Sequence, residues 1–135
     1  MKHGFLIVFG LFFVSVSVFA QKTKPKSEIS YNLESVFISG QKNTISKDKP
    51  ALVFDANGKT AKCITSCNYI DLKYLTKKNK FKFTSVIPGS VPCPDHLLGL
   101  ELDLKENFLK VNSYLIQNSK IYFFNKKDTL IVFYE

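Results

Sequence analysis

Hydrophobic and polar residues alternate with the two-residue period of a β-strand in several segments after residue 30. In the clearest of these, Phe81, Phe83 and Ser85 alternate with lysines and a threonine, which is typical of a strand with one buried face. Polar turn sequences at residues 55–58 and 125–128 separate apolar segments and predict two β-hairpins. The segments predicted as strands are residues 31–38, 51–54, 59–65, 81–85, 114–116, 121–124 and 130–134.

Residues 94–112 carry two overlapping hydrophobic periods. The strand period is found at Leu98, Leu100, Leu102 and Leu104. The helical period of three and four residues is found at Leu97, Glu101, Leu104, Phe108 and Val111. Because a strand of about 15 residues is rare and a helix of that length is ordinary, we predict a helix over residues 95–112. These elements predict the α+β class, with a single small antiparallel β-sheet or half-barrel of about six or seven strands and one helix packed across it.

The first 20 residues have the order of a secretory signal peptide. A charged start precedes an apolar run over residues 5–14, and small residues lead to Ala20. Two serines interrupt the apolar stretch, which is shorter than the about 20 apolar residues of a membrane-spanning helix. We therefore expect cleavage after Ala20 and a secreted or periplasmic protein without a membrane span. A flexible lysine-rich tail is expected over residues 21–29, and one domain over residues 30–135.

Lysine dominates the charged residues of the chain. There are 19 lysines, no arginine and 11 acidic residues, which gives a formal charge of +8, and removal of Lys2 with the signal peptide would leave +7. Arginine supplies the bidentate contacts to phosphates and guanine edges, whereas the lysine ammonium is a hydrated point charge. We therefore expect neither nucleic acid nor an anionic membrane surface as a partner and interpret the lysines as the solubilising surface of a monomer.

Three cysteines, Cys63, Cys67 and Cys93, are the most informative side chains for chemistry. An exported protein meets oxidising conditions, in which three cysteines allow one bridge and leave one thiol over. If residues 63–67 are extended, the Cα atoms of the first two lie about 13 Å apart, which is too far for a disulfide. Burial of all three as apolar thiols is the alternative to a bridge.

A metal site is a second interpretation of these cysteines. Together with His96, residues Cys63, Cys67 and Cys93 form a Cys3His set of the type that binds zinc. Strand geometry separates the first two, and disulfide formation competes for the thiolates. A nucleophilic pair of Cys93 and His96 would need a further group to orient the base and a pocket that excludes water. We expect no metal, no cofactor and no enzymatic activity.

Several short motifs occur in a recognisable order. They are residues 50–54, Ser66-Cys67-Asn68, residues 80–83, Cys93, and then Glu101, Leu104, Phe108, Val111 and Tyr114. This order resembles the META/HslJ-like domain family, over about residues 30–133. The resemblance implies a hairpin before the Ser66-Cys67-Asn68 motif, a helix led by Glu101 and a terminal hairpin. It also implies a disulfide between Cys67 and Cys93, with Cys63 as a core residue or free thiol.

The resemblance further implies an envelope or secreted protein associated with stress tolerance, without an established catalytic mechanism. Glu101 matches the family motif and lies on the apolar stripe of the predicted helix, so we expect it to form a structural hydrogen bond or ion pair. Fold transfers between relatives better than function does.

The segment between the last central strand and the helix is the best candidate for recognition. It contains Ile87, Pro88, Gly89, Ser90, Val91 and Pro92, which we call the recognition loop. Its prolines restrict the backbone and lower the entropic cost of binding. We therefore expect an exported, non-enzymatic module that binds an unidentified protein or small molecule through this loop. The alternatives are a thiol- or metal-dependent site at the cysteines and His96, and a loop-mediated inhibitor of an extracellular hydrolase.

Overall fold

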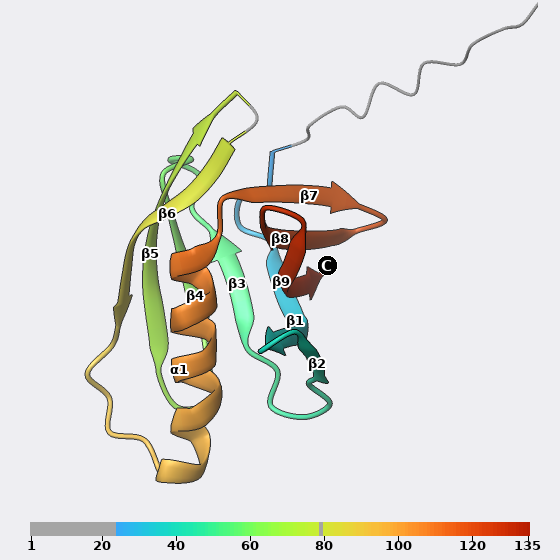
Figure 1. Ribbon diagram of the computed structural model, residues 1–135. Helices are drawn as coiled ribbons and strands as arrows, with labels where there is room; N and C mark the ends of the chain where they lie inside the picture. The colour runs from blue at the N-terminus through green and yellow to red at the C-terminus, as the bar shows by residue number, and fades with distance from the viewer. Residues whose placement is uncertain (1–23, 79) are drawn as a thin grey trace, which may run out of the picture.

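The computed structural model describes residues 24–78 and 80–135, so the predicted signal peptide lies outside the described residues (Figure 1). The described chain contains nine strands and one helix. The elements are β1 Ser30–Ile38, β2 Gln41–Thr44, β3 Ala51–Phe54, β4 Thr60–Ile64, β5 Tyr69–Lys77, β6 Lys80–Pro88, α1 Asp95–Lys110, β7 Ser113–Gln117, β8 Lys120–Asn125 and β9 Asp128–Tyr134.

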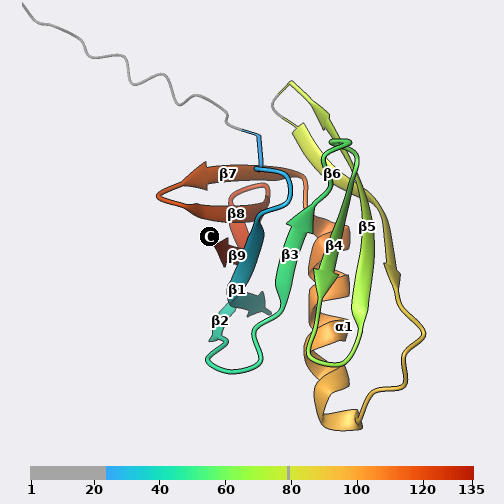
Figure 2. The same ribbon diagram turned by 180° about the vertical axis from the view of Figure 1, so that it is seen from behind.

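All nine strands belong to one sheet. Its order is β6-β5-β4-β3-β1-β9-β8-β7, with β2 paired to β1, and neighbouring strands are antiparallel. The sheet curves around α1, which packs mainly against β6, β1 and β9 (Figures 1 and 2). The two ends of the sheet meet where the backbone N–H of Phe81 donates to the carbonyl oxygen of Asn112 at 3.2 Å. The predicted α+β class, with one helix packed on an antiparallel sheet, is confirmed.

The strand count of six or seven is wrong, because the sequence analysis misses β2 and β5. All four side chains of β2 are polar and exposed, so the segment shows no hydrophobic period and reads as a loop. Pairing with the backbone of β1 alone makes it a strand. In β5 the buried residues Ile70, Leu72 and Tyr74 alternate with exposed ones. This alternation is typical of a strand, but residues 69–77 are not among the segments predicted as strands.

An aromatic core fills the space between the helix and the sheet. Phe108 of α1 packs against Phe83, with ring centroids 4.9 Å apart, and against Phe123 and Phe133 at 6.3 and 6.4 Å. Leu104, one turn earlier, is also fully buried. Positions separated by three and four residues share one helix face, which explains why the helical period of this segment prevails over its strand period. The helix ends at Lys110, close to the predicted boundary.

The described part of the segment assigned to a flexible tail contacts the domain. The backbone N–H of Glu28 donates to the carbonyl oxygen of Phe54 at 2.9 Å, and the backbone N–H of Lys26 donates to the Tyr31 hydroxyl at 3.0 Å. The Lys26 ammonium lies 3.2 Å from the Glu135 carboxylate. Within the two described ranges, no helix has the length and apolar character needed to cross a membrane.

Candidate functional site

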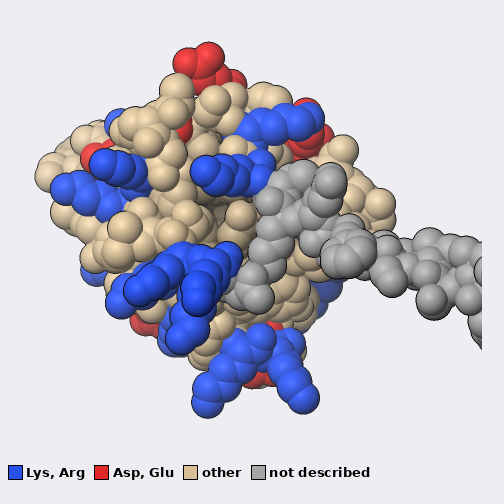
Figure 3. All heavy atoms as spheres, turned by 90° about the horizontal axis from the view of Figure 1, so that it is seen from above, with Lys and Arg blue, Asp and Glu red and all other residues tan. Residues whose placement is uncertain are grey.

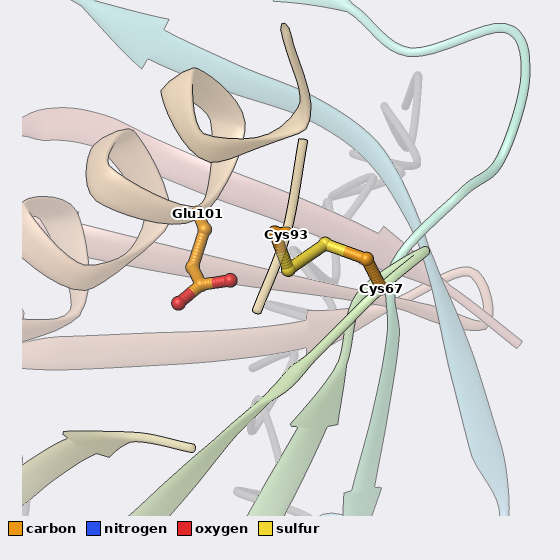
Figure 4. A group of neighbouring side chains, drawn as sticks. All are labelled: Cys67, Cys93 and Glu101. Carbon is orange, nitrogen blue, oxygen red and sulfur yellow. A yellow bond between two sulfur atoms is a disulfide. The ribbon is translucent and has the colours of Figure 1, made fainter. Parts of the chain in front are cut away.

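The disulfide between Cys67 and Cys93 joins the β4–β5 turn to the segment that precedes α1. The two Cα atoms lie 5.8 Å apart, within the range that a disulfide requires. The structure therefore contains the pairing that the family resemblance implies. Figure 4 shows the bridge beside Glu101 of α1. Because Cys93 directly follows Pro92, the bridge anchors one end of the recognition loop.

A buried polar cluster connects the same turn to the helix. Asn68 donates through Nδ2 to the carbonyl oxygen of Gly89 at 3.0 Å and to Oε1 of Glu101 at 3.1 Å. Oδ1 of Asn68 and Oε2 of Glu101 are buried and have no hydrogen-bond partner among the described residues. Buried polar groups favour one conformation when they are paired, because the unpaired state is costly. The predicted structural hydrogen bond of Glu101 is present, and the Asn68 side chain is its donor.

Gly89 fixes the middle of the recognition loop. Its N–H donates to the carbonyl oxygen of Tyr69 at 2.7 Å, while its own carbonyl oxygen accepts from Asn68. A Cβ atom at this position would lie 2.5 Å from Oδ1 of Asn68 and 2.8 Å from the Tyr69 ring. Only glycine fits this close approach without displacing its neighbours. The predicted loop also begins inside a strand, because Ile87 and Pro88 are the last residues of β6 and pair with β5, so only residues 89–92 lie outside it. The loop is therefore attached at its β6 end, at Gly89 and at its Cys93 end.

The ends of the recognition loop present apolar side chains to solvent. Ile87 is 59 % exposed and Val91 is 48 % exposed. Ser90 and Pro92 are exposed as well. Exposed apolar groups on a fixed backbone are typical of recognition surfaces, because little conformational entropy is lost when a partner covers them.

Cys63 does not take part in the disulfide and is fully buried. Burial, and to a smaller extent the charge of nearby Glu101, raise the pKa of its thiol to about 12. A thiol with such a pKa carries almost no thiolate at neutral pH, so it is a poor nucleophile and metal ligand. Cys63 therefore behaves as an apolar core residue.

The predicted Cys3His set is not brought together in the described structure. The group of potential ligands within 4.8 Å of one another consists of Cys67, Cys93 and Glu101, without Cys63 or His96. Zinc binds cysteine as a thiolate, whereas two of these sulfurs are joined to each other. His96 is exposed at the start of α1. This arrangement does not fit a zinc centre.

A groove of about 560 Å³ lies on the outer face of β4, β5 and β6, beside the recognition loop. Its walls include Lys62, Asp71, Lys73, Ser85 and Ile87. The Lys62 ammonium lies 3.3 Å from the Asp71 carboxylate, and 4.4 Å from the centre of a neighbouring tyrosine ring in β5. The sequence-based prediction omits Asp71 and Lys73 because it does not assign β5, although the alternating pattern of that strand could have placed both on one face.

A second cavity, of about 500 Å³, lies between α1, the β1–β2 turn and the β8–β9 turn. Asp103 and Glu106 of the helix and Asp128 of β9 contribute carboxylates, and Lys110 and Lys127 contribute ammonium groups. Burial raises the pKa of Asp103, and the charge of Glu106 raises it further. None of the residues predicted for recognition, metal binding or disulfide formation lines this cavity in the described structure.

These features define a small α+β domain in which a curved antiparallel sheet, one helix and a disulfide support an exposed loop. The chain belongs to the META domain family, which it matches over residues 25–135. This match confirms the resemblance seen in the sequence motifs. Among curated proteins, no match was found.

Two solved structures share the fold. An NMR structure of a protein from Burkholderia xenovorans superposes with a TM-score of 0.63 and 13 % sequence identity, covering 80 % of this chain and 81 % of that chain. A second NMR structure gives a TM-score of 0.53 and 15 % identity, with 78 % of this chain and 87 % of the other covered. Likeness at such low identity supports the fold alone.

Proposed function

We propose that this chain is an exported, non-enzymatic binding module that holds a protein or small-molecule ligand with its recognition loop and the adjacent groove. The observation that carries the proposal is the attachment of the loop. The backbone of Gly89 forms hydrogen bonds with Tyr69 and Asn68, and the disulfide holds Cys93. The side chains of Ile87 and Val91 remain exposed. A loop that is rigid before binding loses little entropy on binding.

The groove extends this surface with polar groups. Ile87 belongs to both the loop and the groove, so an apolar contact on the loop would be continuous with Lys62, Asp71 and Ser85. Binding sites commonly combine an apolar contact area with a few polar groups that orient the ligand. The groove is therefore the part of the surface that would give the ligand its orientation.

The proposal also includes export of the protein and a role in stress tolerance. Export rests on the signal-peptide order of the first 20 residues. The role in stress tolerance rests on the family resemblance described above. Thiol chemistry has less support, since Cys67 and Cys93 are paired and the buried thiol of Cys63 has a strongly raised pKa.

Site-specific photocrosslinking in the expressing cells tests the proposal. A photoreactive amino acid replaces Val91 in one variant and Leu109 in the control, because Leu109 is a similarly exposed apolar residue, at 58 %, on the outer side of α1. We expect a discrete crosslinked species from position 91 and none from position 109. Equal crosslinking at both positions, or none at position 91, would contradict a recognition role for the loop.

Inhibition of an extracellular hydrolase is the second candidate. The same observation favours it, because an exposed loop braced by a disulfide is the type of element that can insert into an active-site cleft without unfolding. Addition of the protein to a panel of secreted proteases and glycosidases would reveal inhibition. Replacement of Ile87 and Val91 by serine should abolish it, and inhibition unchanged by these substitutions would exclude the loop as the cause.

A further inference from the structure

The β5–β6 hairpin and helix α1 carry charges of opposite sign. The β5–β6 hairpin contains five lysines and one acidic residue, Asp71. Helix α1 contains four acidic residues and two lysines. Figure 3 looks onto the end of the molecule where this hairpin turns, and lysine side chains predominate there over carboxylates. The hairpin is therefore a local concentration of positive charge, although twelve of the 17 described lysines lie outside it.

The lysines of the hairpin are exposed and unpaired. They are Lys73, Lys77, Lys78, Lys80 and Lys82. None of them forms an ion pair with another described residue, whereas Lys26, Lys42, Lys62 and Lys120 do. Lys77 also lies directly opposite Lys80 in the strand register, and like charges in that position are unfavourable. An external anionic partner would offset this repulsion.

An exposed leucine lies among these ammonium groups. Leu75 is 62 % exposed and is the register partner of Lys82. Register partners project to the same face of a sheet, so the leucine and the lysines form one outward surface. Apolar side chains combined with lysines are the two components that bind proteins to the interface of anionic membranes.

We propose that the outward face of the β5–β6 hairpin docks on the surface of a membrane that contains anionic phospholipids. The lysines would lie in the anionic headgroup layer, and Leu75 would enter the boundary with the acyl chains. The absence of arginine, which at the sequence level counted against an anionic partner, does not exclude a membrane, because attraction to a charged lipid surface needs point charges and not bidentate geometry.

Apart from Lys73, which also lines the groove, this surface is separate from the recognition loop and the groove. Lys77, Lys78, Lys80 and Lys82 lie around the start of β6, whereas the recognition loop begins at Ile87 near its end, about 23 Å from Lys80 at roughly 3.3 Å per residue. Lys73 lies between them, opposite Ser85. A ligand at the loop and a membrane at the hairpin could therefore be bound together. Failure of one proposal would leave the other intact.

Vesicle co-sedimentation tests the proposal with the protein as the cell produces it. Binding to phosphatidylcholine vesicles with and without phosphatidylglycerol is compared for two variants of equal charge. The test variant is Lys77→Gln/Lys80→Gln/Lys82→Gln, and the control is Lys47→Gln/Lys110→Gln/Lys127→Gln, whose lysines lie outside the hairpin. Any contribution of residues 1–23 to vesicle binding is the same in both variants, because both keep these residues.

We expect binding only to the anionic vesicles, with weaker binding at high salt. A lysine at an anionic surface changes the binding constant about fivefold, so the test variant should bind roughly a hundredfold more weakly. The control should stay much closer to the original protein. Equal losses in both variants, or equal binding to neutral vesicles, would overturn the proposal.

A tryptophan reporter tests the contact at Leu75 directly. The chain contains no tryptophan, so Leu75→Trp and, as a control, Leu109→Trp each introduce a single fluorophore. We expect a blue shift of the emission on anionic vesicles for position 75 and none for position 109. Shifts at both positions, or at neither, would overturn docking through this face. Tight binding to dextran sulfate without binding to vesicles would overturn it too and identify a soluble polyanion as the partner.

Discussion

Gly89 shows how one residue controls the recognition loop. The backbone of the loop passes so close to Asn68 and Tyr69 that no Cβ atom fits between them. The same closeness brings the Gly89 N–H and carbonyl oxygen within hydrogen-bond distance of these two residues. The loop can adopt this conformation because glycine has no side chain.

Substitution Gly89→Ala should destabilise the protein, because the added methyl group would displace Asn68 or the Tyr69 ring. We expect the free energy of unfolding to fall by about 1–3 kcal/mol in urea denaturation. Gly99→Ala is the matched control, since nothing lies within 4 Å of its Cβ position in the helix. The control should gain about 0.5–1 kcal/mol from its higher helix propensity. Equal effects at both glycines would argue against a tight contact at Gly89.

Cys63 should make stability depend on alkaline pH. Its pKa is raised from 9.0 to about 12 in the folded protein, so the folded state holds this proton more tightly than the unfolded state does. The resulting stabilisation is complete below about pH 9 and is lost as the pH rises towards 12. The difference in free energy of unfolding between the original protein and Cys63→Ala should therefore shrink by at most about 1.4 kcal/mol per pH unit in that window. A constant difference would show that the thiol titrates normally.

Among the secondary-structure elements, the disulfide joins the β4–β5 turn to the segment between β6 and α1. Cys67 lies in the β4–β5 turn, and Cys93 lies between β6 and α1. Glu101 adds a hydrogen bond from the helix to Asn68 in the same turn. The start of α1, the end of β6 and this turn are therefore held together by a covalent bond and a buried polar contact.

Replacement of both Cys67 and Cys93 by alanine should lower the free energy of unfolding by about 3–4 kcal/mol, because the bridge closes a loop between residues 26 positions apart. Urea denaturation with and without reductant measures this loss. Reduction of the original protein should lower its stability to a similar degree, whereas the double variant should not respond to reductant. A reductant effect that persists in the double variant would mean that the bridge does not explain it.

The sequence predicts most elements but not the whole sheet. Seven strands and the helix follow from their apolar residues, because most of them bury one face more than the other, while β9 buries four consecutive residues. β2 has no buried face and exists because β1 offers it backbone hydrogen bonds. A strand that is stabilised only by backbone pairing has no signature in its side chains.

At the scale of the whole molecule, the N-terminus predicts where the protein acts. If the first 20 residues are removed on export, 115 of the 135 residues remain and the chain begins at Gln21. Intact mass spectrometry of the protein from the periplasm or medium should find this chain about 2 Da lighter than its fully reduced form. After unfolding without reductant, a single thiol should be alkylated. A mass that includes residues 1–20 would contradict cleavage, and three alkylated thiols would contradict the disulfide.

The sequence by itself determined the family, the α+β class, the helix and the candidate cysteines. These follow from local periods and from the order of short motifs, which do not depend on distant contacts. It also singled out Glu101, since a carboxylate on an apolar helix stripe requires a partner.

Only the tertiary structure decided which groups act together. It brought Asn68, Gly89 and Glu101 into one cluster, left Cys63 as a buried free thiol, and collected the lysines of β5 and β6 on one face. These arrangements depend on strand register and on contacts between residues distant in the chain. A sequence period reveals which side of an element is buried, but not which other element it meets there.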